Sequence, residues 1–198
     1  MMATLNLTGA LERLVVDIVS RSDELSHISP SKLLICLSTT RNGCIHGVYA
    51  KIHPLRFAGG LRSRQERRGR KTFICSMPEV THKGEEMLYI IYFLFPRFFD
   101  LTFREKLITI FHELYHISPD FDGDIRRFHG RNYAHGGPTR KFNAAMGVLA
   151  DSYMEKIENE ELVEFLKFDA SGLRTRHKAL VGRKLKAPRI RISLTETG

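Results

Sequence analysis

The segment His112-Glu113-Leu114-Tyr115-His116 is the feature that most restricts how this chain can fold. Residues four positions apart lie on one face of an α-helix, so a helix here brings both imidazoles to one side. Two imidazoles placed in this way can bind one metal ion, and the carboxylate of Glu113 can reach a water molecule without ligating the metal. The pattern therefore predicts a zinc-hydrolase arrangement, with His112 and His116 as ligands and Glu113 as general base.

The helix that carries this motif has sequence signals at both ends. Thr102, followed by Glu105 three residues later, matches the reciprocal capping box that begins many helices. Pro119 disfavours helical geometry in the residue before it. These signals predict a helix between Asp100 and Ser118.

A third metal ligand must come from elsewhere in the chain, because catalytic zinc sites usually have three protein ligands and keep one position for water. We favour His135, which directly precedes a Gly-Gly-Pro segment at the entrance to the next expected helix. Four other downstream residues have suitable side chains and stay open as alternatives: His129, Asp122, Glu155 and Glu158.

Hydrophobic periodicity predicts an α+β fold. Apolar residues at spacings of three and four indicate a helix over Thr8–Arg21, and a similar stripe from Phe142 to Ile157 indicates another. Segments rich in β-branched and aromatic residues predict four strands, at 33–39, 44–52, 72–77 and 87–95. We expect one small mixed or antiparallel sheet of these strands, packed on the N-terminal helix, the His-Glu-x-x-His helix and the following helix.

Positive charge is concentrated in two segments. The chain carries a formal net charge of +9, and residues 62–71 and 174–191 hold 14 of its 31 basic residues but 1 of its 22 acidic residues. Nearby glycines predict that 62–71 is a long mobile loop, whereas 174–191 has no clear period. Such clusters can neutralise phosphates, so contact with DNA through both segments is an expectation, although solvated loops have the same composition.

Length and hydropathy indicate one domain with an appendage. The 198 residues, 42% of them apolar, can form an ordinary core, and we place a domain at 1–170 and a basic C-terminal tail at 171–198. The longest apolar run has nine residues, fewer than the roughly 20 that span a bilayer, and the first residues do not resemble a signal peptide. We therefore expect no membrane contact and a cytoplasmic location. The three cysteines are expected to be reduced thiols.

The stretch from Tyr89 to Gly136, which contains the His-Glu-x-x-His motif and a later His-Gly pair, resembles the phage and bacterial metallopeptidase family. More distantly it is similar to SprT-type zinc peptidases, in which a later His-Gly leads into a helix with a Phe, as His135, Gly136 and Phe142 do here. The chain departs from the SprT pattern in a longer insertion before His135 and in lacking a later zinc-finger module. The resemblance covers about 33–157 and implies a zincin-like fold, peptidase activity and an association with DNA-bound proteins.

These observations predict a zinc-dependent metallopeptidase that acts on a protein or peptide substrate. Glu113 would take a proton from the attacking water and deliver it to the leaving nitrogen. We expect the strand at 87–95 to lie nearest the helix and to offer an open edge to an extended substrate. The alternative is a non-catalytic adaptor, in which zinc only joins helix to loop and the two basic segments bind nucleic acid. The sequence does not indicate an oligomeric state.

Overall fold

The computed structural model describes residues 2–39, 48–128 and 139–194. A three-stranded mixed sheet lies at its centre, formed by β2 (Leu33–Thr39), β8 (Tyr89–Phe95) and β3 (Ala50–Pro54). β8 is the middle strand, parallel to β2 and antiparallel to β3. Both faces of β2 and β8 are buried, which explains why their sequences are nearly continuous runs of apolar residues.

Two parts of the predicted sheet are wrong. The strand expected at 72–77 forms as β5 (Lys71–Ser76) but pairs in a different sheet, so the central sheet has three described strands instead of four. The strand expected at 87–95 is central and has no open edge, because β2 and β3 occupy both of its sides. The described edge next to the His-Glu-x-x-His helix is β3, which packs against that helix.

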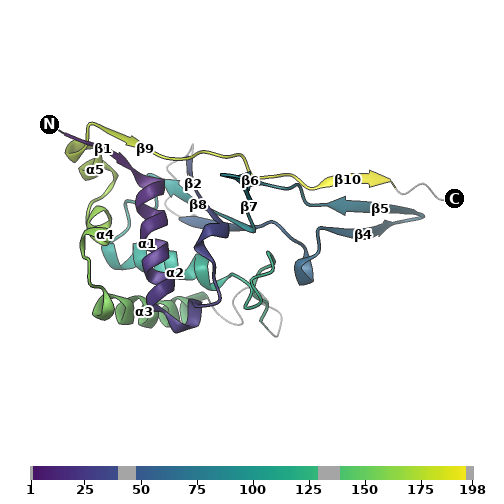
Figure 1. Ribbon diagram of the computed structural model, residues 1–198, viewed down its shortest axis with the longest axis horizontal. Coiled ribbons are helices and arrows are strands. Elements are labelled where there is room, and N and C mark those ends of the chain that lie inside the picture. The colour runs from purple at the N-terminus through teal and green to yellow at the C-terminus, as the bar shows by residue number, and fades with distance from the viewer. Residues whose placement is uncertain (1, 40–47, 129–138, 195–198) are drawn as a thin grey trace.

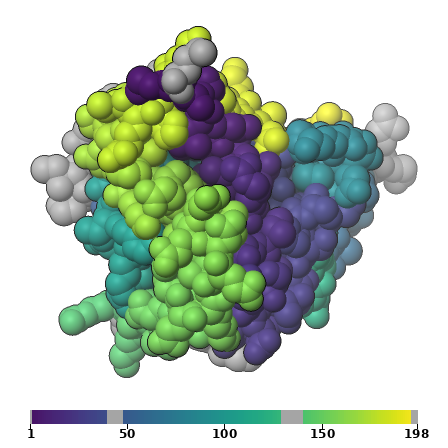
Figure 2. Space-filling model, turned by 60° about the vertical axis from the view of Figure 1, so that its left-hand side comes forward, coloured from purple at the N-terminus to yellow at the C-terminus, as the bar shows by residue number. Residues whose placement is uncertain are grey.

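Helices cover one face of the central sheet (Figure 1). The longer ones are α1 (Leu7–Arg21), α2 (Phe103–Tyr115) and α3 (Thr139–Lys156), and two shorter ones are α4 (Glu161–Glu164) and α5 (Ala170–Arg176). α1 lies beside the helices of residues 139–176 on one face of the molecule (Figure 2). The apolar stripes predicted on α1 and α3 point into one core, which they share with apolar residues of α2 and with the inner sheet face. The mixed α+β class is thereby confirmed.

α2 begins as its sequence signals predict. Thr102 is the N-cap, its hydroxyl accepts a hydrogen bond from the backbone N–H of Glu105, and the Glu105 carboxylate accepts one from the backbone N–H of Thr102. Both bonds satisfy N–H groups that the first helical turn leaves without partners. The local cap thus fixes the residue at which the helix carrying the His-Glu-x-x-His motif begins.

The basic segment 62–71 is not a loop. Residues Ser63–Arg68 form β4, which pairs antiparallel with β5, and β10 (Arg191–Leu194) pairs with the other side of β5. Together these strands form an arm that projects away from the helices (Figure 1). β4 contains no apolar residue, so periodicity could not reveal it; its pairing with β5 decides its conformation.

The remaining elements are short. β1 (Thr4–Asn6) pairs in parallel with β9 (Ala179–Val181), and β6 (Thr81–His82) pairs with β7 (Glu85–Glu86). Single 3-10 turns occupy Asp23–Leu25, Pro30–Lys32, Ala58–Gly60 and Phe165–Lys167. The domain boundary at residue 171 stays a prediction, and the structure adds that Leu173 of α5 is fully buried in the main core. Cys36 and Cys75 are buried free thiols, as expected.

Candidate metal centre

α2 brings the two motif histidines together. His112 lies in the last turn of the helix and His116 is its C-cap residue, which still has helical backbone angles. Their ring centroids are 4.7 Å apart, with the ring planes at 75°. The spacing of four residues thus places both imidazoles on one side of α2, as the motif predicts.

A phenylalanine from α3 packs against both rings. Phe142 is stacked on His116, with centroids 5.3 Å apart and planes at 14°, and it meets His112 edge to face at 4.9 Å. The Phe142 side chain is buried and belongs to the core. Because the ring is fixed by the core, it restricts the orientations that either imidazole can adopt.

Asn143, the next residue of α3, holds the ring of His112. Oδ1 of Asn143 lies 2.8 Å from Nδ1 of His112. If Nδ1 carries the proton of this hydrogen bond, Nε2 is the nitrogen left in the form that ligates a metal. Motif analysis does not identify Asn143, although residues that orient a ligand histidine through its second nitrogen are usual at metal sites.

Glu113 lies in a protected position between α2 and β3. Its side chain is 6% exposed, and its carboxyl group accepts a hydrogen bond from the backbone N–H of Ile52 on β3. Burial raises the pKa of Glu113 to about 7, although the bond from Ile52 acts in the opposite direction. A carboxyl group with a pKa in this range can exchange a proton near neutral pH.

The chain after α2 folds back and holds the C-terminal end of the helix. The backbone N–H of Arg126 donates to the carbonyl of His116 at 2.7 Å, and its guanidinium Nε donates to the carbonyl of Tyr115 at 2.9 Å. The buried hydroxyl of Tyr89 fixes the same turn by donating to the carbonyl of Asp124. The last carbonyls of α2 are thereby satisfied, which stabilises the helix end that carries the histidines.

A cavity of about 300 Å³ lies beside the motif. His112 and Glu113 line it from α2, Asn143 lines it from α3, and Ala50 with the residues just before it closes the opposite side. The motif carboxylate and one motif imidazole therefore face a space between the helix and the edge strand of the sheet. Such a space can admit part of a substrate next to both groups.

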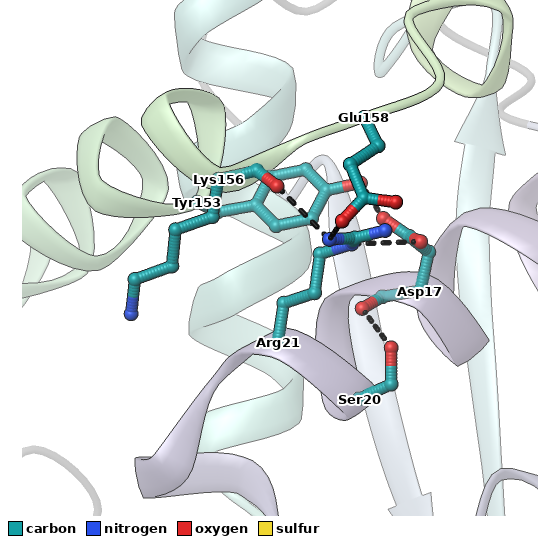
Figure 3. A network of polar contacts seen from close by, with 6 residues as sticks. All are labelled: Asp17, Ser20, Arg21, Tyr153, Lys156 and Glu158. Carbon is teal, nitrogen blue, oxygen red and sulfur yellow. Dashed lines mark hydrogen bonds and ion pairs between the residues drawn. The ribbon is translucent and has the colours of Figure 1, made fainter.

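Three of the five candidates for a third ligand lie within the described residues. His135 and His129 lie outside the described residues. Within the described residues no cluster of three or more ligand-type side chains is found, so Asp122, Glu155 and Glu158 do not join His112 and His116. Asp122 instead accepts a hydrogen bond from the backbone N–H of Asp124, and Glu158 pairs with Arg21 of α1 at 3.0 Å (Figure 3).

The donor set fits a divalent metal that accepts nitrogen ligands. Two imidazoles one helical turn apart, one of them oriented through Nδ1, are typical ligands of zinc.

A His-Glu-x-x-His helix packed beside a mixed sheet is an arrangement typical of metallopeptidases. Residues 7–146 match the family described as "Putative phage metallopeptidase", and since this match covers well over half of the sequence, the chain belongs to that family. The family description indicates a metal-dependent peptidase, which agrees with the motif. No curated protein and no solved structure gives a match. Among the described helices, none has the length and apolar character needed to cross a bilayer.

Proposed function

We propose that this chain is a zinc-dependent peptidase whose metal is held by His112, His116 and His135. The observation that carries the proposal is the pair of imidazoles 4.7 Å apart beside the buried carboxyl group of Glu113. His135 stands in the sequence where the resemblance to SprT-type peptidases expects a third ligand, and His129 is its alternative. The zincin-like fold belongs to this same proposal.

Zinc, when bound, supplies Lewis-acid chemistry that makes water more acidic and polarises a peptide carbonyl. The chain supplies the proton transfer: Glu113 accepts the proton of the attacking water and passes it to the leaving nitrogen. Its bond from Ile52 holds one side of the carboxyl group toward β3, so the carboxyl group has a defined position at the cavity wall.

β3 is the segment that we expect to bind the substrate backbone. It is an edge strand among the described residues, it packs against α2, and the residues around Ala50 line the cavity next to Glu113. An extended peptide added to this edge would gain backbone hydrogen bonds without a requirement for particular side chains. This assignment replaces the strand at 87–95, which the structure places in the middle of the sheet.

The non-catalytic alternative is less well supported. A metal that only joins α2 to the following loop needs ligands, but it does not need a carboxyl group buried beside them. The structure has such a group in Glu113, which a purely structural metal site does not explain. The basic segments that support nucleic-acid contact lie outside the cavity beside the motif, so peptidase activity and nucleic-acid binding can coexist in one chain.

The substitution Glu113→Gln tests the proposal. We expect the variant to retain zinc and to lose casein hydrolysis by at least about 100-fold, because Gln keeps the shape but cannot accept the proton. Glu161→Gln, an exposed change on α4, is the matched control and should cleave at the wild-type rate. Full chelator-sensitive activity in Glu113→Gln would show that another group is the base.

A further inference from the structure

The chain after β9 is attached firmly to the central sheet. The backbone N–H of Leu37 on β2 donates to the carbonyl of Arg183 at 2.7 Å, and the guanidinium of Arg183 donates to the carbonyl of Ile35 and pairs with Glu12 of α1. At Gly182 the backbone comes so close to Leu37 that a Cβ would lie 2.5 Å from its Cδ1. These contacts fix the path of residues 182–184 beside β2.

Two cavities adjoin this attached segment. One has a volume of about 460 Å³ and lies toward α5 and β9, and the other has a volume of about 1010 Å³ and lies toward β3 and β8. They share three lining residues, Leu37, Thr39 and Lys184, so they adjoin one another. We call the two adjoining cavities together the C-terminal groove. In Figure 1 the segment after β9 runs past β2 and β8 towards the arm.

Every charged side chain that lines the C-terminal groove, within the described part of the chain, is basic. Arg174 and Lys178 line the smaller cavity, Lys184 lines both, and Lys51, Lys186 and Arg189 line the larger one. Lys184, Lys186 and Arg189 are exposed, and no carboxylate among residues 2–39, 48–128 and 139–194 forms an ion pair with them. Their charges are therefore available to a ligand.

The basic segment 62–71 differs because several of its cations form ion pairs within the protein. On the arm, Arg62 pairs with Glu79 and Glu86, while Arg64 and Arg68 both pair with Glu66. Half of its six cations are thus compensated within the protein. The two basic segments are similar in composition but differ in the structure. As far as the described residues extend, a concave surface is lined by cations without an ion pair at Lys51, Arg174, Lys178, Lys184, Lys186 and Arg189, whereas Arg183 pairs with Glu12.

We propose that the C-terminal groove binds a single strand of nucleic acid through its phosphates. An acidic peptide would satisfy the cations, but Leu37, Phe95 and Leu185 also line the groove and would meet no apolar surface on a run of carboxylates. A nucleic acid strand presents a charge at every nucleotide and an apolar base face between charges. Single strands fit better than duplexes because only unstacked bases can enter a hollow of this kind.

This proposal is independent of the peptidase activity. The cationic residues of the groove, Lys51 apart, lie beyond residue 146, where the family match ends. Binding is measured on the full chain with the Glu113→Gln substitution, so that self-cleavage cannot alter the result. Failure of nucleic-acid binding would leave the proposed hydrolysis unaffected, and the reverse also holds.

The test compares two triple variants that change the net charge equally. The groove variant is Lys184→Glu, Lys186→Glu and Arg189→Glu, and the arm variant is Arg67→Glu, Arg70→Glu and Lys71→Glu. Fluorescence anisotropy with a labelled oligothymidylate about 20 nucleotides long measures the affinity. We expect the groove variant to bind at least about 10-fold more weakly. The magnitude of its slope of log K against log salt concentration should fall by about 2, whereas the arm variant should change affinity by less than about 3-fold.

Two further measurements keep the proposal falsifiable. A neutral variant, Lys184→Gln, Lys186→Gln and Arg189→Gln, should weaken binding in the same direction while its thermal unfolding midpoint stays at the wild-type value, which separates lost contacts from lost folding. A duplex of equal length and polyglutamate should both bind more weakly than the single strand. Equal losses in the groove and arm variants, or equal binding of duplex or polyglutamate, would overturn the proposal.

Discussion

Oδ1 of Asn143 on α3 lies 2.8 Å from Nδ1 of His112 on α2, so one helix orients the proposed ligand carried by the other. Asn143→Ala removes this partner. We expect the zinc affinity to fall by about 10- to 100-fold, because the ring loses its fixed orientation and the preference for the tautomer that ligates through Nε2. Competition with a chromophoric chelator measures the affinity.

The control for Asn143 is on the same helix. Val148 is 68% exposed, and Val148→Ala should leave zinc affinity unchanged. Asn143→Asp keeps an oxygen acceptor at the same position and should restore most of the affinity. An Asn143→Ala protein that binds zinc as tightly as the wild type would show that the hydrogen bond does not position His112.

The capping box of α2 gives a prediction for stability and its dependence on pH. Thr102→Ala should lower the free energy of unfolding by about 1 kcal/mol at neutral pH, as urea denaturation measures it. Hydrogen bonds from Thr102 hold the pKa of Glu105 below its ordinary value of 4.5. A carboxyl group whose pKa is lower in the folded state than in the unfolded state stabilises the fold at pH values above its unfolded-state pKa. This contribution is lost as the pH falls through the folded-state pKa.

The difference between wild type and Thr102→Ala should therefore shrink as the pH falls below about 4.5. Thr175→Ala is the control: Thr175 is an exposed residue of α5 whose hydroxyl donates to the carbonyl of Ser171, and its loss should change stability by less than about 0.5 kcal/mol. A constant difference at all pH values would mean that the carboxylate of Glu105 does not contribute to the cap.

Removing the hydroxyl should change the free energy of unfolding differently at two buried tyrosines. Tyr153 on α3 donates to the carboxylate of Asp17 on α1 at 2.7 Å, within the polar network that joins these helices (Figure 3). Tyr153→Phe removes this partly buried hydrogen bond, so we expect it to lower the free energy of unfolding by about 1 to 2 kcal/mol. Denaturant titration at neutral pH measures the change.

Tyr92 is the matched case, because its hydroxyl is buried and finds no hydrogen-bond partner among the described residues. Tyr92→Phe removes an unsatisfied polar group and should leave stability unchanged or raise it by about 1 kcal/mol. Burial raises the pKa of Tyr92 to about 12, which agrees with a hydroxyl held away from water. If Tyr92→Phe destabilised the protein more than Tyr153→Phe, the described contacts of these hydroxyls would not govern the energetics.

Local signals predicted the elements that depend on their own sequence. The helix at 103–115 follows from Thr102 and Glu105, and β2 follows from the unbroken apolar run at Leu33–Leu37 that begins it. Neither feature depends on a distant partner. The same holds for the apolar stripe of α3, whose Phe142, Met146 and Tyr153 are buried.

Pairing between distant segments could not be predicted in this way. β4 is a strand because β5 lies beside it, and β10 joins the same sheet from more than 100 residues away in the chain. The position of β8 in the middle of the central sheet also depends on which strands flank it, and an apolar run does not encode its neighbours. The arm and the edge strand were therefore assigned wrongly.

The site, like the fold, has residues that local sequence predicts and residues that only packing brings together. The two histidines and Glu113 follow from helical spacing, since four residues return the chain to one face. Asn143 and Ile52 contact the motif only through packing of α2 against α3 and β3, so no local pattern could identify them. His135 was selected by its position in the sequence and stays a prediction.

The zinc content of the purified chain tests the central claim most directly. Elemental analysis after dialysis should give about one zinc ion per wild-type chain and the same for His177→Ala, a histidine outside the motif. His112→Ala and His116→Ala should each lose the metal while keeping the helical circular dichroism of the wild type. Unchanged zinc content in both variants would contradict the claim that α2 holds a metal through these two imidazoles.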